Sequence, residues 1–145
     1  MNTALVRSDS AWNASTRRAG LGWTTRTRNQ RTSSTDTVDH VSSPLLAESL
    51  ALRAALTECR EMHVRDLRCE AYSSQLIRAV TSNSKSKEIY GIVADIKSLA
   101  LSFVVISFCW IPREMNSEAD LLAKQSLSTK QVNRVITTAN QLYDD

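Results

Sequence analysis

Apolar and polar residues alternate in two short stretches near the N-terminus, Ala4–Asp9 ("ALVRSD") and Ala19–Arg26 ("AGLGWTTR"). Alternation of this kind is typical of half-buried β-strands, and the polar, turn-forming residues between the two stretches indicate an antiparallel hairpin. We expect a third strand within 33–42, although the segment around it is rich in Ser and Thr and holds few apolar residues. A flexible loop is the alternative interpretation of that segment.

The chain then changes to the patterns of helices and helix-linked strands. Pro44–Met62 combines a proline suited to a first turn with apolar residues at spacings of three and four, which predicts a helix. Farther on we expect a strand at 66–72, a short helix capped by Ser73 or Ser74, a helix at about 87–101, a strand at 103–111, and a helix from 117 to about 127 capped by Asn116. The strand at 103–111 is apolar on both faces, which is expected of a strand covered on both sides. Hairpin strands followed by helix-linked strands predict an α/β fold, a mixed sheet with helices on its faces.

The length and apolar content of the chain favour a single domain. With 145 residues and 42% hydrophobic content, the chain can form one sizeable core, and we place the domain at 1–128, followed by a tail at 129–145 for which a further helix is one interpretation. The longest apolar run, "FVVISFCWI", is far shorter than the roughly 20 residues that a membrane-spanning helix needs. The chain does not open with a signal-peptide pattern. We therefore expect a soluble, intracellular protein without membrane association, in a compartment that the sequence does not specify.

The cysteines favour no metal or disulfide chemistry. Cys59, Cys69 and Cys109 lie far apart and form no CxxC pair. We expect them to be small, buried apolar residues in a reducing compartment. The two histidines, His40 and His63, are expected on the surface or in loops.

Positive charge is concentrated in the N-terminal third of the chain. The net charge is only +3, but residues 1–35 carry six arginines against the single acid Asp9. An asymmetry of this kind indicates contact with phosphate groups. An ordinary solvated surface is the competing interpretation.

Three carboxylates stand at positions where chemistry is possible. Asp9 ends the first predicted strand, Glu48 lies within the apolar stripe of the long helix, and Asp120 lies near the start of the last helix. A carboxylate on a buried face is costly unless a partner compensates it, and a shared cation is one such partner. Taken singly, these acids also suit a turn, a salt bridge and a helix dipole, respectively.

Three longer segments carry a resemblance to a known family. They are "VRSDSAWNASTRRAGLGW" at 6–23, "SPLLAESLALRAAL" at 43–56 and "WIPREMNSEADLLAK" at 110–124. With these segments the sequence resembles the ribonuclease H superfamily, and most closely plant retroelement-related ribonuclease H-like proteins. The third segment is the most specific, because it is a long and irregular match. The resemblance extends over about residues 4–127.

The resemblance implies a five-stranded mixed sheet flanked by helices and a site of four carboxylates. In the family these hold two Mg²⁺ ions, with Mn²⁺ as a substitute, and the RNA strand of an RNA/DNA hybrid is hydrolysed. Asp9 matches the first carboxylate, Glu48 the second and Asp120 the fourth. Tyr72 stands at the position of the third, and a neutral phenol is a poor magnesium ligand. Glu70 is a possible substitute, but it lies roughly 6 to 7 Å back along the strand.

Two functions follow from the resemblance. The first is a metal-dependent ribonuclease acting on RNA/DNA hybrids, and the alternative is a catalytically impaired nucleic-acid-binding module, motivated by Tyr72 and by the lack of a histidine in the loop before the last helix. A protein-interaction domain or a decaying retroelement fragment is a third possibility. We expect a monomer whose partner is an RNA/DNA hybrid or double-stranded RNA, recognised through phosphates and 2′-hydroxyls. The expected contact residues are Arg7, Trp12, Asn13, Arg17, Arg18 and Asn116.

Overall fold

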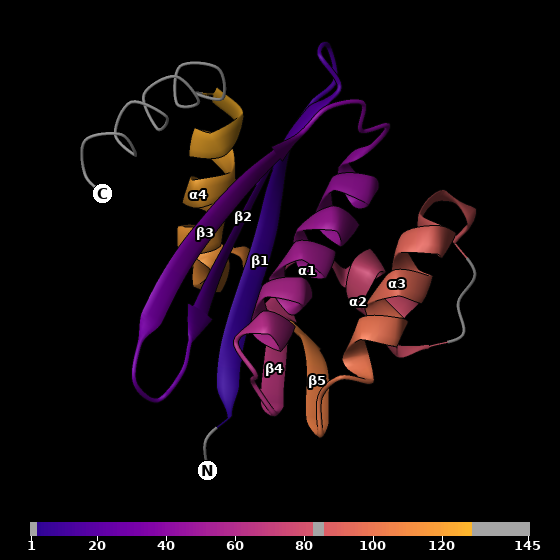
Figure 1. Ribbon diagram of the computed structural model, residues 1–145. Coiled ribbons are helices and arrows are strands. Elements are labelled where there is room, and N and C mark those ends of the chain that lie inside the picture. The colour runs from indigo at the N-terminus through magenta and orange to yellow at the C-terminus, as the bar shows by residue number, and fades with distance from the viewer. Residues whose placement is uncertain (1–2, 83–85, 129–145) are drawn as a thin grey trace.

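A five-stranded mixed sheet forms the centre of the protein (Figure 1), for which a computed structural model describes residues 3–82 and 86–128. The strands are β1 (Ala4–Asn13), β2 (Arg18–Arg26), β3 (Arg31–Val38), β4 (Asp66–Ala71) and β5 (Val105–Trp110). They lie in the order β3-β2-β1-β4-β5. The pairs β1–β2 and β2–β3 are antiparallel, whereas β1–β4 and β4–β5 are parallel. The predicted hairpin and the mixed sheet are therefore confirmed, and the uncertain third segment is a strand.

Helices cover both faces of this sheet. They are α1 (Pro44–Glu61), α2 (Ser74–Thr81), α3 (Tyr90–Ala100) and α4 (Ser117–Ser128), with short 3-10 helices η1 (Lys87–Ile89) and η2 (Arg113–Asn116) before α3 and α4. Figure 1 shows α1, α2 and α3 on one face of the sheet and α4 on the other. Ser43 caps α1 by accepting a hydrogen bond from the Leu46 N–H, and Ser73 caps α2 in the same way.

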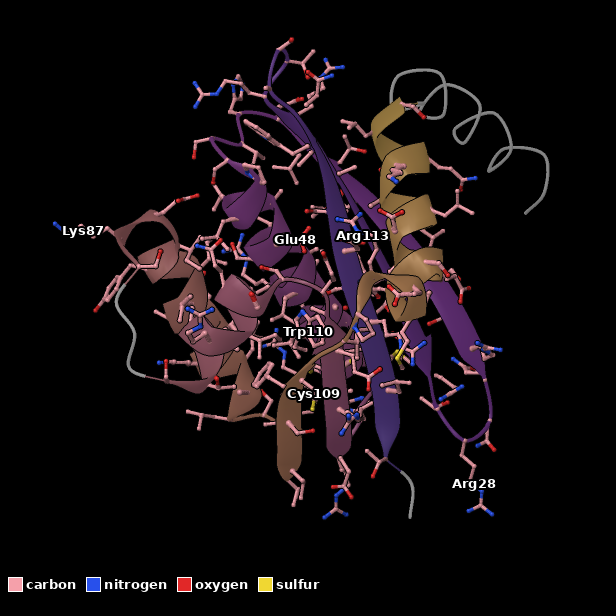
Figure 2. The ribbon with its side chains drawn as sticks, turned by 180° about the vertical axis from the view of Figure 1, so that it is seen from behind. Arg28, Glu48, Lys87, Cys109, Trp110 and Arg113 are labelled. Atoms are coloured by element: carbon pink, nitrogen blue, oxygen red, sulfur yellow. The ribbon has the colours of Figure 1, made fainter. Side chains whose placement is uncertain are left out.

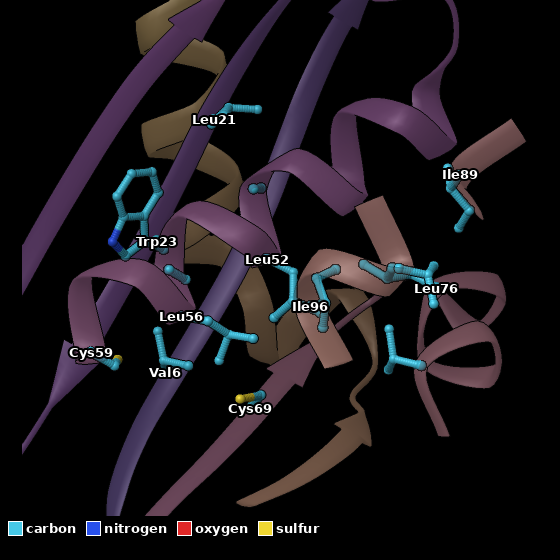
Figure 3. Packing of buried hydrophobic residues seen from close by; sticks show 14 of the residues in the cluster. Val6, Leu21, Trp23, Leu52, Leu56, Cys59, Cys69, Leu76, Ile89 and Ile96 are labelled. Atoms are coloured by element: carbon cyan, nitrogen blue, oxygen red, sulfur yellow. The ribbon is translucent and has the colours of Figure 1, made fainter. Parts of the chain in front are cut away.

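The main core lies between α1 and the sheet. The face of β1 that carries Val6 packs with Leu52 and Leu56 of α1, and all three side chains are almost fully buried. Figure 3 shows these residues with their neighbours Cys59 and Cys69. Both cysteines are buried as predicted, but Cys109 is partly exposed.

Two glycines let α4 lie directly on β2. A Cβ atom at Gly20 would come within 2.2 Å of the Ala123 carbonyl oxygen, and one at Gly22 within 2.6 Å of the Ala123 backbone nitrogen. Any larger residue would therefore meet the backbone of α4, which cannot yield as a flexible side chain can. This close contact fixes α4, and with it Asp120, over the centre of the sheet.

The strand β5 differs from the prediction. It is an edge strand, bonded only to β4, and Val105 and Trp110 are 58% and 50% exposed. The prediction that both of its faces are covered is wrong, because no helix of residues 3–82 and 86–128 lies over the face of β5 that carries Val105 (Figures 1 and 2). Trp110 lies on the other face, at the end of the strand. The apolar residues at 103–111 are therefore not all buried.

The two histidines, the C-terminal tail and the helix lengths were also subjects of prediction. His40 and His63 are exposed, as expected, and both have positive φ angles near 60°. The tail predicted at 129–145 lies outside the described residues. Among the helices in the described ranges, none is both long and apolar enough to cross a membrane.

Candidate active site

The side chains of Asp9 and Glu48 meet where β1 passes the N-terminal part of α1. Ser10 joins them: its backbone N–H lies 2.8 Å from Asp9 Oδ1 and 3.1 Å from Glu48 Oε1, and its hydroxyl also donates to Glu48 Oε1. Asp9 is only 8% exposed. Both acids were predicted from the sequence, whereas Ser10 was not, because its only signal is its place directly after Asp9.

Burial dominates the electrostatics of this pair. It raises the pKa of Glu48 to about 8, with the negative charge of Asp9 adding to the effect. Burial also raises the pKa of Asp9, and the charge of Asp120 adds to the shift, although the hydrogen bond from Ser10 works against it. Burial and mutual repulsion therefore both favour a proton shared by this pair of carboxyl groups.

Asp120 lies in the first turns of α4 and faces the same region. Its carboxylate forms an i,i+4 ion pair with Lys124 at 2.9 Å, and its side chain is 21% exposed. Asn116, just before α4, donates from Nδ2 to the Ser8 carbonyl oxygen at 3.0 Å. This buried bond ties the start of α4 to β1, and so holds Asp120 near Asp9.

A tyrosine and an arginine occupy the remaining side of the site. Tyr72 follows the last residue of β4, and its ring centroid lies 6.4 Å from that of Trp110 at the end of β5. The guanidinium carbon of Arg113, in η2, lies 4.6 Å from the Tyr72 ring centroid. The charge of Arg113 also acts on Asp9, whose pKa it lowers. At this corner the structure therefore has an aromatic ring and a fixed positive charge (Figure 2 labels Arg113, Glu48 and Trp110).

This arrangement does not suit the two metal ions that the family implies. Within residues 3–82 and 86–128, no group of three or more His, Cys, Asp or Glu side chains is close enough to hold a metal ion. Glu48 is bound by Ser10, Asp120 is paired with Lys124, and the third position is a tyrosine. Of the acids predicted for the site, Asp9 and Glu48 come together at the Ser10 N–H.

Glu70 does not replace the missing acid in this conformation. Its carboxylate accepts from Arg7 Nε at 2.8 Å and from Arg68 Nε at 2.7 Å, and its side chain is 7% exposed. Burial acts to raise the pKa of Glu70, but the bonds from Arg68 and Arg7 outweigh it and the pKa is lowered. Glu70 is thus the centre of an ion-pair cluster on β1 and β4 and is not directed toward Asp9.

The residues expected to contact nucleic acid have different environments. Arg17 is exposed in the β1–β2 turn, where its φ is 60°, and Arg18 pairs with Asp39 at 2.9 Å. Asn13 accepts hydrogen bonds within the same turn, and Trp12 donates to the Val41 carbonyl oxygen at 2.8 Å.

Asn116 has neither of the two roles predicted from the sequence, a helix cap and a nucleic-acid contact. It is 1% exposed, and its amide is bonded to β1. It is therefore neither a cap whose side chain accepts from α4 nor available to a nucleic acid, because the tertiary contact with Ser8 takes its side chain inward.

The sheet order and the helices on its two faces, with acids on β1, α1 and α4, define the ribonuclease H fold. Ribonuclease H1 from Halobacterium salinarum NRC-1 superposes with a TM-score of 0.80 at 22% identity, over 87% of this chain and 98% of that one. The N-terminal RNase H domain of a Mycobacterium tuberculosis protein superposes with a TM-score of 0.80 at 18% identity, and the match covers 92% of this chain and 99% of that one. LC11-RNase H1 in complex with an RNA/DNA hybrid superposes with a TM-score of 0.77 at 20% identity, and the match covers 88% of this chain and 99% of that one. At these identities the likeness concerns the fold.

The sequence itself assigns the family. The model of the family described as reverse transcriptase-like matches residues 7–126. The chain therefore belongs to this family, within the ribonuclease H superfamily. No curated protein sequence matches the chain.

Proposed function

We propose that this protein binds RNA/DNA hybrids or double-stranded RNA at the carboxylate site and that it cleaves them poorly or not at all. The observation that carries this proposal is the contact between Arg113 and Tyr72, 4.6 Å from guanidinium carbon to ring centroid. In the family the third carboxylate would stand at Tyr72. Here a ring and a cation fill that corner, so the site has lost a negative charge and an oxygen ligand.

Several observations support nucleic acid as the partner. A solved structure with the same fold is that of LC11-RNase H1 in complex with an RNA/DNA hybrid. The first hairpin of this chain presents the exposed Arg17 and the partly exposed Arg18 at its turn, next to the end of β1. Arginine side chains bind phosphate oxygens with their planar fork of donors. Arg113 adds a positive charge beside Asp9, where a metal ion would otherwise offset the repulsion between carboxylates and a phosphate.

Metal-dependent hydrolysis of the RNA strand is the second candidate. The close approach of Asp9 and Glu48 favours it, because Mg²⁺ is usually bound through one or two carboxylates together with the phosphates of a substrate. Asp120 would be the third acid. Under this candidate Asp9, Glu48 and Asp120 are the catalytic acids.

One experiment separates the two candidates. A labelled RNA/DNA hybrid is incubated with the wild type, with Asp9→Asn, and with Asp95→Asn, an exposed acid on α3 that serves as the matched control. Binding is measured by fluorescence anisotropy, and cleavage by gel electrophoresis with Mg²⁺ or Mn²⁺. We expect salt-sensitive binding by the wild type without RNA cleavage. Cleavage that Asp9→Asn abolishes and Asp95→Asn leaves intact would establish the second candidate, and absence of any binding would exclude both.

A further inference from the structure

The face of the sheet that carries Asp9 is covered only in part. The helix α4 lies over the middle of β2, at Gly20 and Gly22, and the strand ends toward Leu5 extend beyond it. Figure 2 looks onto this face and shows the lower parts of β1, β4 and β5 without a helix in front of them. This part of the sheet is therefore open to a partner.

Four arginines lie on this open area. In one row across the strands, Arg31 of β3 pairs with Arg26 of β2, Arg26 pairs with Leu5 of β1, and Leu5 pairs with Arg68 of β4. Arg7 stands in the next row of β1, toward Asp9. Paired residues in a sheet share a face, so these side chains point the same way. We call Arg7, Arg26, Arg31 and Arg68 the arginine face.

Two members of the arginine face are held in place. The side chain of Glu70, 7% exposed, accepts from both Arg7 and Arg68, whose side chains stay 31% and 50% exposed. One buried carboxylate thus orients two guanidinium groups and leaves one net positive charge. Because the arginines are already ordered, a ligand loses less side-chain entropy when it binds them.

The other two arginines repel each other. Arg26 and Arg31 are directly opposite across β2 and β3, which destabilises a sheet when the charges are alike. Within the described part of the chain, neither forms an ion pair with an acid. Together with Arg7 they line a small hollow of about 40 Å³ that also contains Ser33 and a single acid, Glu118. A bound anion would relieve the repulsion between the two arginines.

We propose that the arginine face binds the sugar-phosphate backbone of a nucleic-acid strand that continues from the carboxylate site. Arg7 is two residues before Asp9 on the same face of β1, about 7 Å away along the strand. Asn116 is bonded to the Ser8 carbonyl oxygen between these two residues, so a strand that runs from Asp9 to Arg7 passes beside the start of α4. From Arg31 to Arg68 the row crosses three strand spacings, about 14 Å, which is long enough to contact more than one successive phosphate of a strand. Four guanidinium groups against two acids, Glu70 and Glu118, favour the phosphates of the nucleic acid bound at Asp9 as the partner.

The chemistry of the surface specifies the mode of binding. The positions of the two rows are occupied by Arg, Ser, Thr, Leu, Glu and Cys, without an aromatic residue on which a base could stack. Arginine forks and hydroxyl groups bind phosphates, which carry no sequence information. Binding at this face is therefore independent of sequence and strongly dependent on salt. The inference rests on the proposed function, since it extends the same bound strand.

The test compares two double variants of equal charge. Arg26→Gln/Arg31→Gln removes half of the arginine face, whereas Arg60→Gln/Arg78→Gln removes two exposed arginines from α1 and α2. The dissociation constant of a labelled RNA/DNA hybrid is measured by anisotropy at several salt concentrations. We expect the first variant to bind about 10- to 60-fold more weakly at roughly 0.1 M salt, with a logarithmic salt slope smaller by about 1.8. The control variant should match the wild type.

The outcomes are distinguishable from a failure of the proposed function. If the wild type binds the hybrid and both double variants bind equally well, the arginine face is not a binding surface, while the proposed function stands. If Arg26→Gln/Arg31→Gln weakens binding but Arg113→Gln, which removes the positive charge beside Asp9, binds like the wild type, the strand does not continue from the carboxylate site and this inference is overturned. Displacement of the hybrid by polyglutamate at the same charge concentration would overturn the inference, because the partner would then be any polyanion. Circular dichroism of each variant verifies that it is folded.

Discussion

The guanidinium group of Arg113 stacks on the ring of Tyr72, 4.6 Å from its centroid, at the corner where the family resemblance calls for a carboxylate. The departure from the family pattern is therefore larger than one missing acid. A positive charge held over an aromatic face is stable in its own right. Restoring an acid at Tyr72 would place that acid next to a cation that competes with a metal ion for it.

The first prediction concerns this competition. Tyr72→Asp alone should bind Mn²⁺ little better than the wild type, because Arg113 pairs with the new carboxylate. The double variant Tyr72→Asp/Arg113→Gln should bind Mn²⁺ at least tenfold more tightly, since even outer-shell groups change metal affinity by that factor. Isothermal titration calorimetry measures both affinities. Tyr72→Phe, which keeps a ring, is the control and should leave Mn²⁺ binding unchanged. Equal affinities of the single and double variants would show that Arg113 does not compete.

The second prediction concerns the contact between α4 and β2. Gly22→Ala adds a Cβ atom that would lie 2.6 Å from the Ala123 backbone nitrogen and 2.7 Å from the Ala119 carbonyl oxygen. Since backbone on both sides must shift, we expect a loss of about 3 kcal/mol in the free energy of unfolding. Gly91→Ala in α3, where nothing lies within 4 Å, is the control and should stabilise by up to about 1 kcal/mol. Urea unfolding followed by circular dichroism measures both changes, and equal effects would contradict the close packing of α4.

The third prediction concerns the buried bond between Asn116 and Ser8. Asn116→Ala removes the donor and leaves the buried Ser8 carbonyl oxygen without this partner. We expect the free energy of unfolding to fall by about 1 to 3 kcal/mol. Asn13→Ala, at the exposed β1–β2 turn, serves as the comparison. If the loss for Asn116→Ala were no larger than that for Asn13→Ala, the bond would not anchor α4.

The fourth prediction concerns pH. The folded-state pKa of Glu70 lies below its ordinary value of 4.5. The stabilisation from its ionised form is therefore complete above pH 4.5 and is lost as the pH falls below that value. At pH 7, the free energy of unfolding of Glu70→Gln should be lower than that of the wild type by about 1 to 2 kcal/mol. The loss is modest because both arginine partners are partly exposed to solvent.

The measurement is a difference between two proteins. The gap in unfolding free energy between the wild type and Glu70→Gln should shrink as the pH is lowered from 7 toward 3. A gap that stays constant over this range would mean that the ion pairs of Glu70 do not contribute. Glu118→Gln, an exposed acid on α4, provides the control for general charge effects.

The sequence predicted the elements whose burial follows a simple period. Ala4–Asp9 alternates because one face of β1 packs on α1, and Pro44–Met62 carries a stripe because one side of α1 packs on the sheet. The apolar run at 103–111 led to a wrong prediction of burial, because its exposed valines are as apolar as buried ones. The pattern therefore cannot show that β5 is an edge strand. The segment 27–43 was ambiguous because Ser and Thr pair well across strands without an apolar signal.

The acids of the site followed from the family resemblance, but their surroundings did not. Ser10 bridges Asp9 and Glu48 only because α1 crosses β1 at that point. The stacking of Arg113 on Tyr72 likewise depends on how η2 passes the end of β4. Such contacts join segments that are far apart in the chain, and no local pattern encodes them.

The hydrogen bond between Ser8 and Asn116 spans 108 residues of sequence. The strand that carries Asp9 is therefore synthesised well before the helix that brings Asp120 to the site. Until α4 has been synthesised, Gly20 and Gly22 lack the helix backbone that they contact, and Asp9 lacks the neighbouring charge of Asp120. The carboxylate site can therefore be complete only after translation has passed α4.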